Sequence, residues 1–254
     1  MWRDTPLKTR RGKTTAQTAA RIVDYLKNEK EVLDQKTGYY SKGQAPSMWL
    51  GQGAAALGLE VGGVVGERDL YELLQGHLPH GTDLSARGGR AAQARLGTDI
   101  TLSAPKSYSI MATSDPSLLK LWDESVKVAA AFIEKELVTA RTGKGGAVIE
   151  RPGKAVIAAY RHEDTRMVDG TADMDLHAHL LTLNMVQRAD GEWTRMDLQL
   201  GERRVLAKMT DFAQKAWLAQ QLQKRGYEVR VTEDGFEFAA ISQEAIDQNS
   251  RRTA

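Results

Sequence analysis

The segment Leu176–Met185 constrains the fold of this 254-residue chain more than any other feature. Six of its ten residues are apolar, which predicts a strand buried inside a sheet, yet it carries His177 and His179. Side chains two residues apart on a strand share a face, so the two imidazoles project together while their apolar neighbours pack on the opposite face. A fold built around this strand must therefore keep part of one sheet face for histidine chemistry.

A third histidine, His162, follows the apolar segment Ala155–Tyr160, which also predicts a strand. If the two strands are sheet neighbours, the three imidazoles converge on one metal ion. Three neutral imidazoles leave the full charge on a divalent cation, with coordination positions open for phosphate oxygens or water. A lone His-x-His pair more often packs in a core. The third histidine shifts the balance towards a metal site.

The remaining pattern interleaves helices with antiparallel hairpins rather than with regular crossover units. Helices are predicted over 14–36, 116–141 and about 202–225, and hairpins over 147–160, around 188–192 and over 227–240. The first of these hairpins would turn at residues 151–154. This order favours an α/β fold, a two-layer sandwich with a central antiparallel sheet.

The amino-acid composition excludes several chemistries, and the distribution of charge fits more than one function. The chain has no cysteine, which excludes disulfides, zinc-thiolate sites and cysteine nucleophiles and fits a reducing cytoplasm. The net charge is only +2, but residues 1–30 and 201–230 each hold a local excess of Lys and Arg. Such an excess suits a phosphate backbone, and equally a solvated face or a basic arm. No apolar run could span a bilayer, so we expect no membrane insertion.

Two charged residues near a predicted strand over 98–103 are candidate site residues. Asp99 could accept the free N–H of a metal-bound histidine, take a proton from a nucleophile, or simply cap a turn. Lys106 could contact phosphate or be a solvated lysine at a helix start.

Tyrosines supply candidate nucleophiles. Tyr25 lies in a basic helical region, and Tyr39 and Tyr40 are adjacent near a Gly-rich stretch. A phenol with a pKa of about 10 needs a metal or a base to attack phosphorus. Exchanging one phosphodiester for another conserves bond energy, so a cut strand could be resealed without ATP. Packing is the alternative role for each of these rings.

Several of these segments resemble one family in order. Asp99–Ser107 is similar to the signature Asp-Leu-Thr-Phe-Ser-Ala-Pro-Lys-Ser, and His162–His179 is similar to a spaced three-histidine motif. Together with Trp49–Ala54 they resemble the relaxase domain of the TrwC/TraI (MobF) family of conjugative relaxases, within the HUH endonucleases. The resemblance covers about residues 20–250.

The resemblance implies a palm-like HUH relaxase fold and a specific chemistry. It implies that His162, His177 and His179 bind Mg²⁺ or Mn²⁺, that Asp99 assists them, and that Lys106 and Arg166 contact DNA. It also implies site- and strand-specific nicking and rejoining of single-stranded DNA at a plasmid origin of transfer (oriT). The cut would leave a 5′-phosphotyrosyl link and a free 3′-OH.

The tyrosine pattern departs from the family. Members carry two closely spaced Tyr-Tyr pairs near the start, whereas here a single Tyr25 is followed, after a longer gap, by Tyr39-Tyr40. We assign the first nucleophile to Tyr25 and a second strand transfer to Tyr39 and Tyr40.

The resemblance also implies an organisation and a setting. We expect one relaxase domain over 1–254, with 1–20 as a basic arm and 200–254 as a helix and hairpin near the DNA cleft. It would be the N-terminal part of a larger relaxase-helicase. Expected partners are single-stranded oriT DNA, relaxosome accessory proteins and a type IV secretion coupling protein, in the bacterial cytoplasm and on transfer into the recipient cell.

Three other functions remain open. A rolling-circle replication initiator shares the histidine strand and the tyrosine. A three-histidine metallohydrolase would use activated water and leave no protein–DNA link. A non-catalytic DNA-binding module would use its histidines only for structure.

Overall fold

A central antiparallel sheet organises the chain. The computed structural model describes residues 2–9, 12–28, 46–85, 94–164, 174–198 and 204–250. Its main strands are β1 (Trp2–Lys8), β2 (Ser47–Leu50), β3 (Arg95–Ser103), β6 (Ala155–Asp164), β7 (Met174–Gln187) and β8 (Trp193–Thr194). They form a six-stranded sheet in the order β1-β3-β7-β6-β2, with β8 paired to β7. Every pairing is antiparallel, which confirms the predicted sheet.

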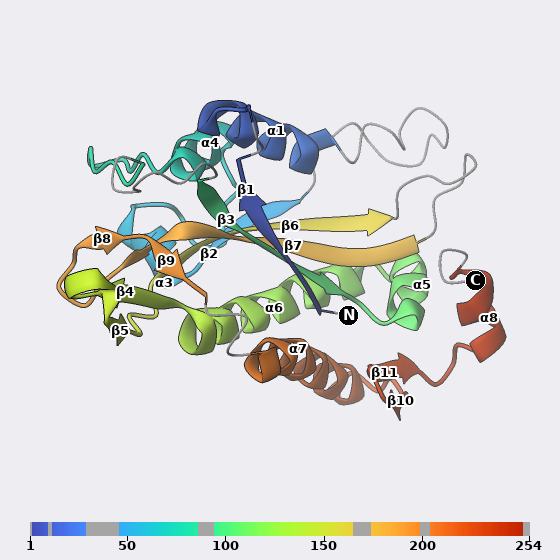
Figure 1. The fold of residues 1–254 in the computed structure, drawn as a ribbon. Helices are drawn as coiled ribbons and strands as arrows, with labels where there is room; N and C mark the ends of the chain where they lie inside the picture. Colours follow the sequence, from blue (N-terminus) through green and yellow to red (C-terminus); the bar gives the residue numbers. More distant parts are fainter. Residues whose placement is uncertain are drawn as a thin grey trace.

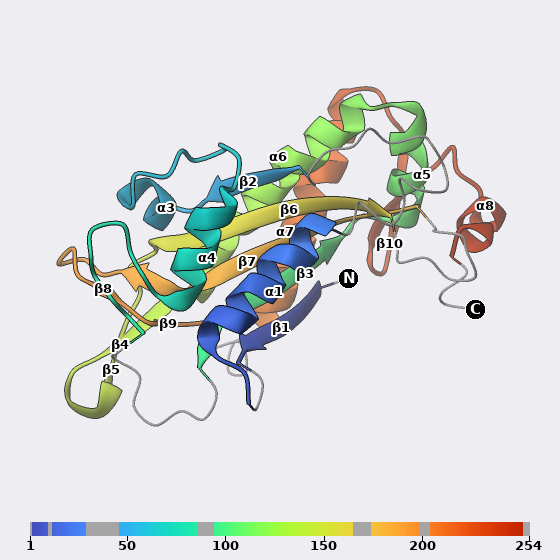
Figure 2. The ribbon, with the colours of Figure 1, turned by 90° about the horizontal axis from the view of Figure 1, so that it is seen from above.

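Helices cover both faces of this sheet (Figure 1, Figure 2). One face carries α1 (Thr15–Asn28), α3 (Gln52–Ala56) and α4 (Glu67–Gln75). The other carries α5 (Lys106–Ser114) and α6 (Ser117–Phe132), and α7 (Arg204–Lys224) lies along α6. The arrangement therefore has helices on both sides, where the sequence predicted two layers.

The reason lies in strand β7, which is apolar on both faces. Leu180 belongs to a buried cluster with Trp122 of α6 and Leu218 of α7. Leu181, the next residue, points to the opposite face of the sheet and belongs to a second buried cluster, which contains Leu26 of α1. Because successive strand residues point to opposite faces, two apolar faces need two helical covers.

Smaller elements complete the described chain. A π-helical turn (Ile133–Leu137) extends α6, and a short 3-10 turn covers Lys144–Gly146. Strands β4 (Thr139–Thr142), β5 (Val148–Glu150) and β9 (Met196–Asp197) form a three-stranded sheet. Strands β10 (Val229–Thr232) and β11 (Gly235–Phe238) form the C-terminal hairpin, followed by α8 (Gln243–Gln248). The hairpins predicted around 188–192 and over 227–240 are confirmed.

The hairpin predicted over 147–160 is wrong. Strand β5 pairs with β4, whereas β6 pairs with β2 and β7. The turn that closes the β4–β5 hairpin contains Gly143, Gly145 and Gly146, all with φ between 70° and 75°, a backbone region that glycine adopts readily. The predicted helix over 116–141 is also too long, because β4 already begins at Thr139.

The N-terminal residues also differ from expectation. Residues 2–8, which the sequence assigned to a basic arm, form β1 at the edge of the sheet beside β3. The pairing satisfies the outer backbone groups of β3, which would otherwise form an open edge. Helix α1 covers residues 15–28 of the helix predicted over 14–36, and residues 29–45 lie outside the described part of the chain.

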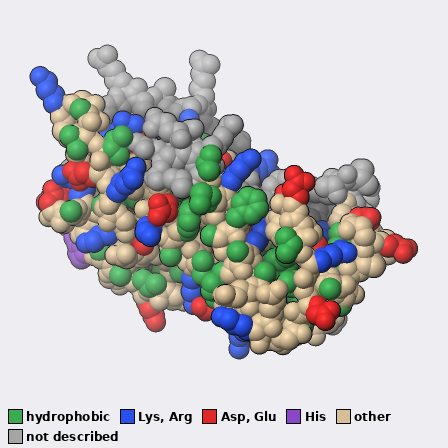
Figure 3. Space-filling model, turned by 90° about the horizontal axis from the view of Figure 1, so that it is seen from below, with side chains coloured by type: hydrophobic (Ala, Val, Ile, Leu, Met, Phe, Trp, Pro, Cys, Tyr) green, Lys and Arg blue, Asp and Glu red, His purple; other side chains and the backbone are tan. Residues whose placement is uncertain are grey.

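The outer side of α7 forms much of the face opposite α1. Hydrophobic side chains gather there between charged ones (Figure 3). Val205, Met209 and Phe212, which follow one another at helical spacing, are all exposed. No helix in the described ranges is both long enough and apolar enough to cross a bilayer.

Candidate active site

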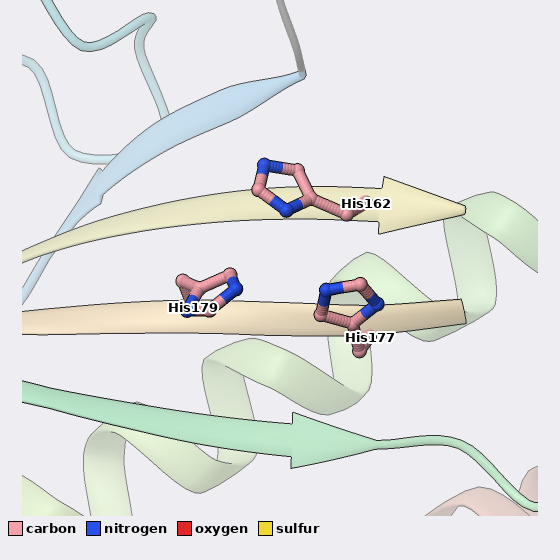
Figure 4. Close-up of side chains that lie close together, drawn as sticks. All are labelled: His162, His177 and His179. Carbon is pink, nitrogen blue, oxygen red and sulfur yellow. The ribbon is translucent and has the colours of Figure 1, made fainter. Parts of the chain in front are cut away.

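Three histidines meet on the α1 side of the sheet, at the adjoining ends of β6 and β7 (Figure 4). The register places His162 directly opposite His177, and His179 lies two residues further along β7. The ring centroids are 5.0 to 5.2 Å apart, and one nitrogen from each ring lies within 4.8 Å of the others. The predicted convergence of the three imidazoles is therefore present in the structure.

Hydrogen bonds orient two of these rings. Nδ1 of His179 donates to the carboxylate of Asp99, at 2.8 and 3.0 Å from its two oxygens. Nδ1 of His177 donates to the backbone carbonyl of Asp175 at 2.7 Å. With both Nδ1 atoms acting as donors, each neutral ring presents Nε2 as its lone-pair nitrogen.

Burial favours the neutral form of His177. Desolvation lowers its pKa, the hydrogen bond to Asp175 raises it, and the neighbouring imidazoles of His179 and His162 lower it again. A neutral imidazole is the form that binds a metal ion. The histidine cluster is thus prepared electrostatically as well as geometrically for a cation.

An ion-pair network fixes β6 beside His162. Arg161, on the opposite face of the strand, contacts the carboxylate of Asp123 in α6 at 2.6 Å and that of Glu163 at 3.2 Å. The arginine is largely buried, and burial raises the pKa of Asp123 while Arg161 lowers it. The strand end that carries His162 is therefore tied to the helix beneath the sheet.

Tyr25 comes to the histidines from α1. Its ring stands edge-on to the His179 imidazole, with centroids 6.2 Å apart and planes at 85°. The tyrosine is 39% exposed, so a substrate can reach it. The helix starts with a reciprocal cap, in which the backbone N–H groups of Thr14 and Gln17 each donate to the other residue's side chain.

A groove of about 790 Å³ adjoins these residues, between α1 and the strands β1 and β3. Tyr25, Asp99 and His179 line one part of it. Four cationic side chains also line it: Arg3, Lys8, Lys13 and Arg21. The sequence showed these cations only as a local charge excess, because their common groove depends on β1 joining the sheet.

Of the other predicted site residues, one has a described position in the structure and three do not. Lys106 lies at the start of α5, and its Nζ donates to the carbonyl of Met174 at 2.8 Å. Tyr39, Tyr40 and Arg166 lie outside the described residues. Sequence reasoning missed the carbonyl of Asp175 as the acceptor for His177, because every residue type has a backbone carbonyl and the sequence does not mark which one is used.

Comparisons with known proteins agree with this architecture. The family model described as TrwC relaxase matches residues 19–254. The chain is 31% identical over 227 residues to the multifunctional conjugation protein TraI of Escherichia coli, a match that covers 85% of this chain and 12% of that protein. TraI of strain K12 is 31% identical over 205 residues, which is 77% of this chain and 11% of that protein. The chain thus spans about an eighth of the length of these relatives.

Solved structures of the conjugative relaxase TrwC are similar over the whole chain. The metal-free and metal-bound complexes of TrwC with oriT DNA each have a TM-score of 0.80 and 31% identity, covering 100% of this chain and 80% of theirs. A copper-bound complex has a TM-score of 0.81 and 32% identity with the same coverage. Sequence and fold agree, and the chain belongs to the TrwC relaxase family.

Proposed function

We propose that this chain nicks and rejoins single-stranded DNA at a plasmid origin of transfer, through a covalent 5′-phosphotyrosyl intermediate formed first on Tyr25. The observation that carries the proposal is the Tyr25 ring standing edge-on to His179, at the border of the three-histidine cluster. Relatives that are named conjugation proteins, and TrwC structures in complex with oriT DNA, support the choice of substrate.

The histidines suit a divalent cation. Their nitrogens face one another, and the remaining ring nitrogens of His177 and His179 already have acceptors. We propose that His162, His177 and His179 hold Mg²⁺ or Mn²⁺. A bound divalent cation supplies positive charge that polarises a phosphate oxygen and stabilises the charge that develops there. TrwC itself has a metal-bound structure, which supports the proposal that this chain binds a metal.

Tyr25 supplies the nucleophile in this proposal. Its hydroxyl oxygen attacks phosphorus in line, a bond from that oxygen to phosphorus forms, and the bond to the 3′ oxygen breaks. The phenol proton passes to solvent, and the departing 3′ oxygen takes a proton from solvent. One phosphodiester replaces another, so the reverse reaction restores the strand. Asp99, which accepts the N–H of His179, holds that ring in place rather than serving as the base.

The basic groove offers a path for the strand. Arg3, Lys8, Lys13 and Arg21 line it beside Tyr25, and cations at such positions neutralise backbone phosphates. Apolar side chains, among them Leu7 and Ile22, line the same groove and can contact sugars and bases. The groove thus supports binding of an extended single strand that passes the histidine cluster.

The proposal extends to residues and partners expected from the family. Tyr39 and Tyr40 would serve a second strand transfer, and Arg166 would contact DNA. One relaxase domain over 1–254 would work within a longer relaxase-helicase in the bacterial cytoplasm, with relaxosome proteins and a secretion coupling protein. It would pass to the recipient cell with the DNA. The multifunctional name of the much longer TraI relatives supports this setting.

The test is incubation with single strands that carry origins of transfer, with Mg²⁺ or Mn²⁺. We expect a denaturant-resistant protein–DNA adduct that is lost in Tyr25→Phe, in His177→Ala and on chelation. Tyr71→Phe, in α4 and outside the histidine cluster, is the matched control and should form the adduct normally. Mapping the peptide joined to DNA would separate Tyr25 from Tyr39 and Tyr40.

Other outcomes would support the alternatives. Clean hydrolysis without an adduct would indicate a metallohydrolase, and retarded but intact DNA would indicate a binding module. Adducts formed only with replication-origin hairpins would indicate a rolling-circle initiator.

A further inference from the structure

The start of β7, which carries His177, is held from outside the sheet ladder. Lys106 donates from Nζ to the carbonyl of Met174, the first residue of the strand, at 2.8 Å. Leu176 is held on both sides, since its N–H donates to Oγ of Ser109 at 3.0 Å and its carbonyl accepts from the N–H of Ala104 at 2.9 Å. Three contacts from one short segment thus hold Met174 and Leu176, two of the three residues before His177.

These contacts matter because the sheet pairing of β7 is interrupted at this point. The pairing of β3 with β7 ends at Ser103 opposite His177. On the other side, the register between β6 and β7 shifts just beyond His162, and the pairing resumes with Asp164 opposite Met174. The 104–109 segment therefore adds hydrogen bonds to residues of β7 that β3 no longer pairs and that β6 pairs again only at Met174. A strand end without such support frays.

The supporting segment is itself fixed by the C-terminal hairpin. The backbone N–H of Ser107, in the first turn of α5, donates to the carboxylate of Glu237 at 2.9 Å. Oγ of Ser107 accepts from the N–H of Phe238 at 2.8 Å. Ser107 is fully buried, and Phe238 packs against Tyr108 with ring centroids 5.8 Å apart. A carboxylate at the first turn of a helix is a stabilising cap.

We propose that Lys106 is a positioning residue for the metal centre, which acts by fixing the start of β7 so that His177 stays opposite His162. The inference rests on the proposed metal-binding role of the three histidines. The ammonium group of Lys106 is directed at the Met174 carbonyl. Lys106 therefore holds the protein backbone rather than contacting the DNA backbone. The hairpin β10–β11 holds Lys106 in register by capping α5.

The test titrates Mn²⁺ alone into the metal-free protein. Lys106→Met keeps the length of the side chain and removes the donor, and residues that orient metal ligands typically change metal affinity by about 10- to 100-fold. We expect Mn²⁺ to bind about tenfold more weakly to Lys106→Met and to recover with Lys106→Arg, which keeps a donor. Lys120→Met, exposed on α6, is the control and should bind Mn²⁺ normally.

A second measurement separates positioning from contact with DNA. Affinity for a single strand in chelator, measured across salt concentrations, should be the same for Lys106→Met and the unaltered protein. Unchanged Mn²⁺ affinity in Lys106→Met would overturn the inference. So would a loss of strand affinity with a salt slope reduced by about 0.7, the signature of one lost phosphate contact.

Two further outcomes are defined. If Lys106→Met does not fold, Ser109→Ala is tested in its place, because it removes the acceptor for the Leu176 N–H. Ser109→Ala must then show the same loss of Mn²⁺ affinity, or the inference fails. If the unaltered protein binds no Mn²⁺, the proposed metal site itself fails and the inference falls with it. That failure differs from a failure of the Lys106 inference alone, because it is seen in the unaltered protein before any residue is substituted.

Discussion

Asp99→Asn tests whether a carboxylate holds the metal-binding geometry of His179. Asp99 accepts the Nδ1 hydrogen of His179 between two oxygens, at 2.8 and 3.0 Å. Asparagine has the same shape and keeps one acceptor oxygen, so the substitution removes the negative charge and little else. The side chains of Asp99 and His179 are only 15% and 9% exposed, which limits replacement of the bond by water.

The expected magnitude follows from the kind of hydrogen bond that is lost. A bond to a charged group contributes about 1.5 to 3 kcal/mol, against about 1 kcal/mol for a neutral one. The difference, about 0.5 to 2 kcal/mol, corresponds to a roughly 2- to 30-fold weaker Kd for the metal. The loss falls on metal binding because a less basic and less constrained imidazole is a poorer ligand.

Calorimetric titration of Mn²⁺ measures this loss directly. Asp190→Asn, in the exposed turn before β8, is the matched control and should leave the Kd unchanged. Nicking at saturating Mn²⁺ should then be close to normal in Asp99→Asn. An unchanged Kd would refute the orienting role. A nicking rate that stays low at saturating metal would instead assign Asp99 to proton transfer.

Three further predictions concern the groove and the core. Arg21→Ala, in the groove, should weaken strand binding and reduce the salt slope of the binding constant by about 0.7, as equilibrium titrations across salt would show. Lys215→Met removes the cation that contacts the buried Asp211 carboxylate at 2.9 Å, and should lower the free energy of unfolding by about 3 kcal/mol in urea titrations. Burial raises the pKa of Glu134, so its stabilising contribution is complete below the ordinary value of 4.5 and is lost as pH rises through the raised pKa. Glu134→Gln should flatten the dependence of melting temperature on pH across that range.

The histidine cluster could be predicted because it depends on strand periodicity. His177 and His179 share a face on any strand, whatever lies around them. The partner strand was also visible, since His162 follows an apolar run. The register that sets His162 opposite His177 could not be predicted. A shift of one residue in the pairing would turn the His162 side chain to the other face of the sheet without changing the residue pattern.

Long-range pairing explains what the sequence could not predict. Pro152-Gly153 and the glycines at 143–146 are both good turn signals, and local pattern alone favoured the first. The competition was decided by partners far along the chain, since β6 pairs with β2 and β7. The Lys106 bond to Met174 is likewise invisible, because its acceptor is a backbone carbonyl 68 residues away.

The place of Tyr25, the proposed nucleophile, follows from the same strand that carries the histidines. On β7, His177 and His179 share their face with Leu181 and Leu183, which are buried in the cluster that also holds Leu26 of α1. Leu26 is 1% exposed and directly follows Tyr25, so core packing fixes the helix one residue from the phenol. Apolar burial places α1 far more strongly than an edge-on ring contact does. The distance between Tyr25 and the histidines is therefore set by the hydrophobic half of the strand face, which lies beside the polar half that would hold the metal in the proposed function.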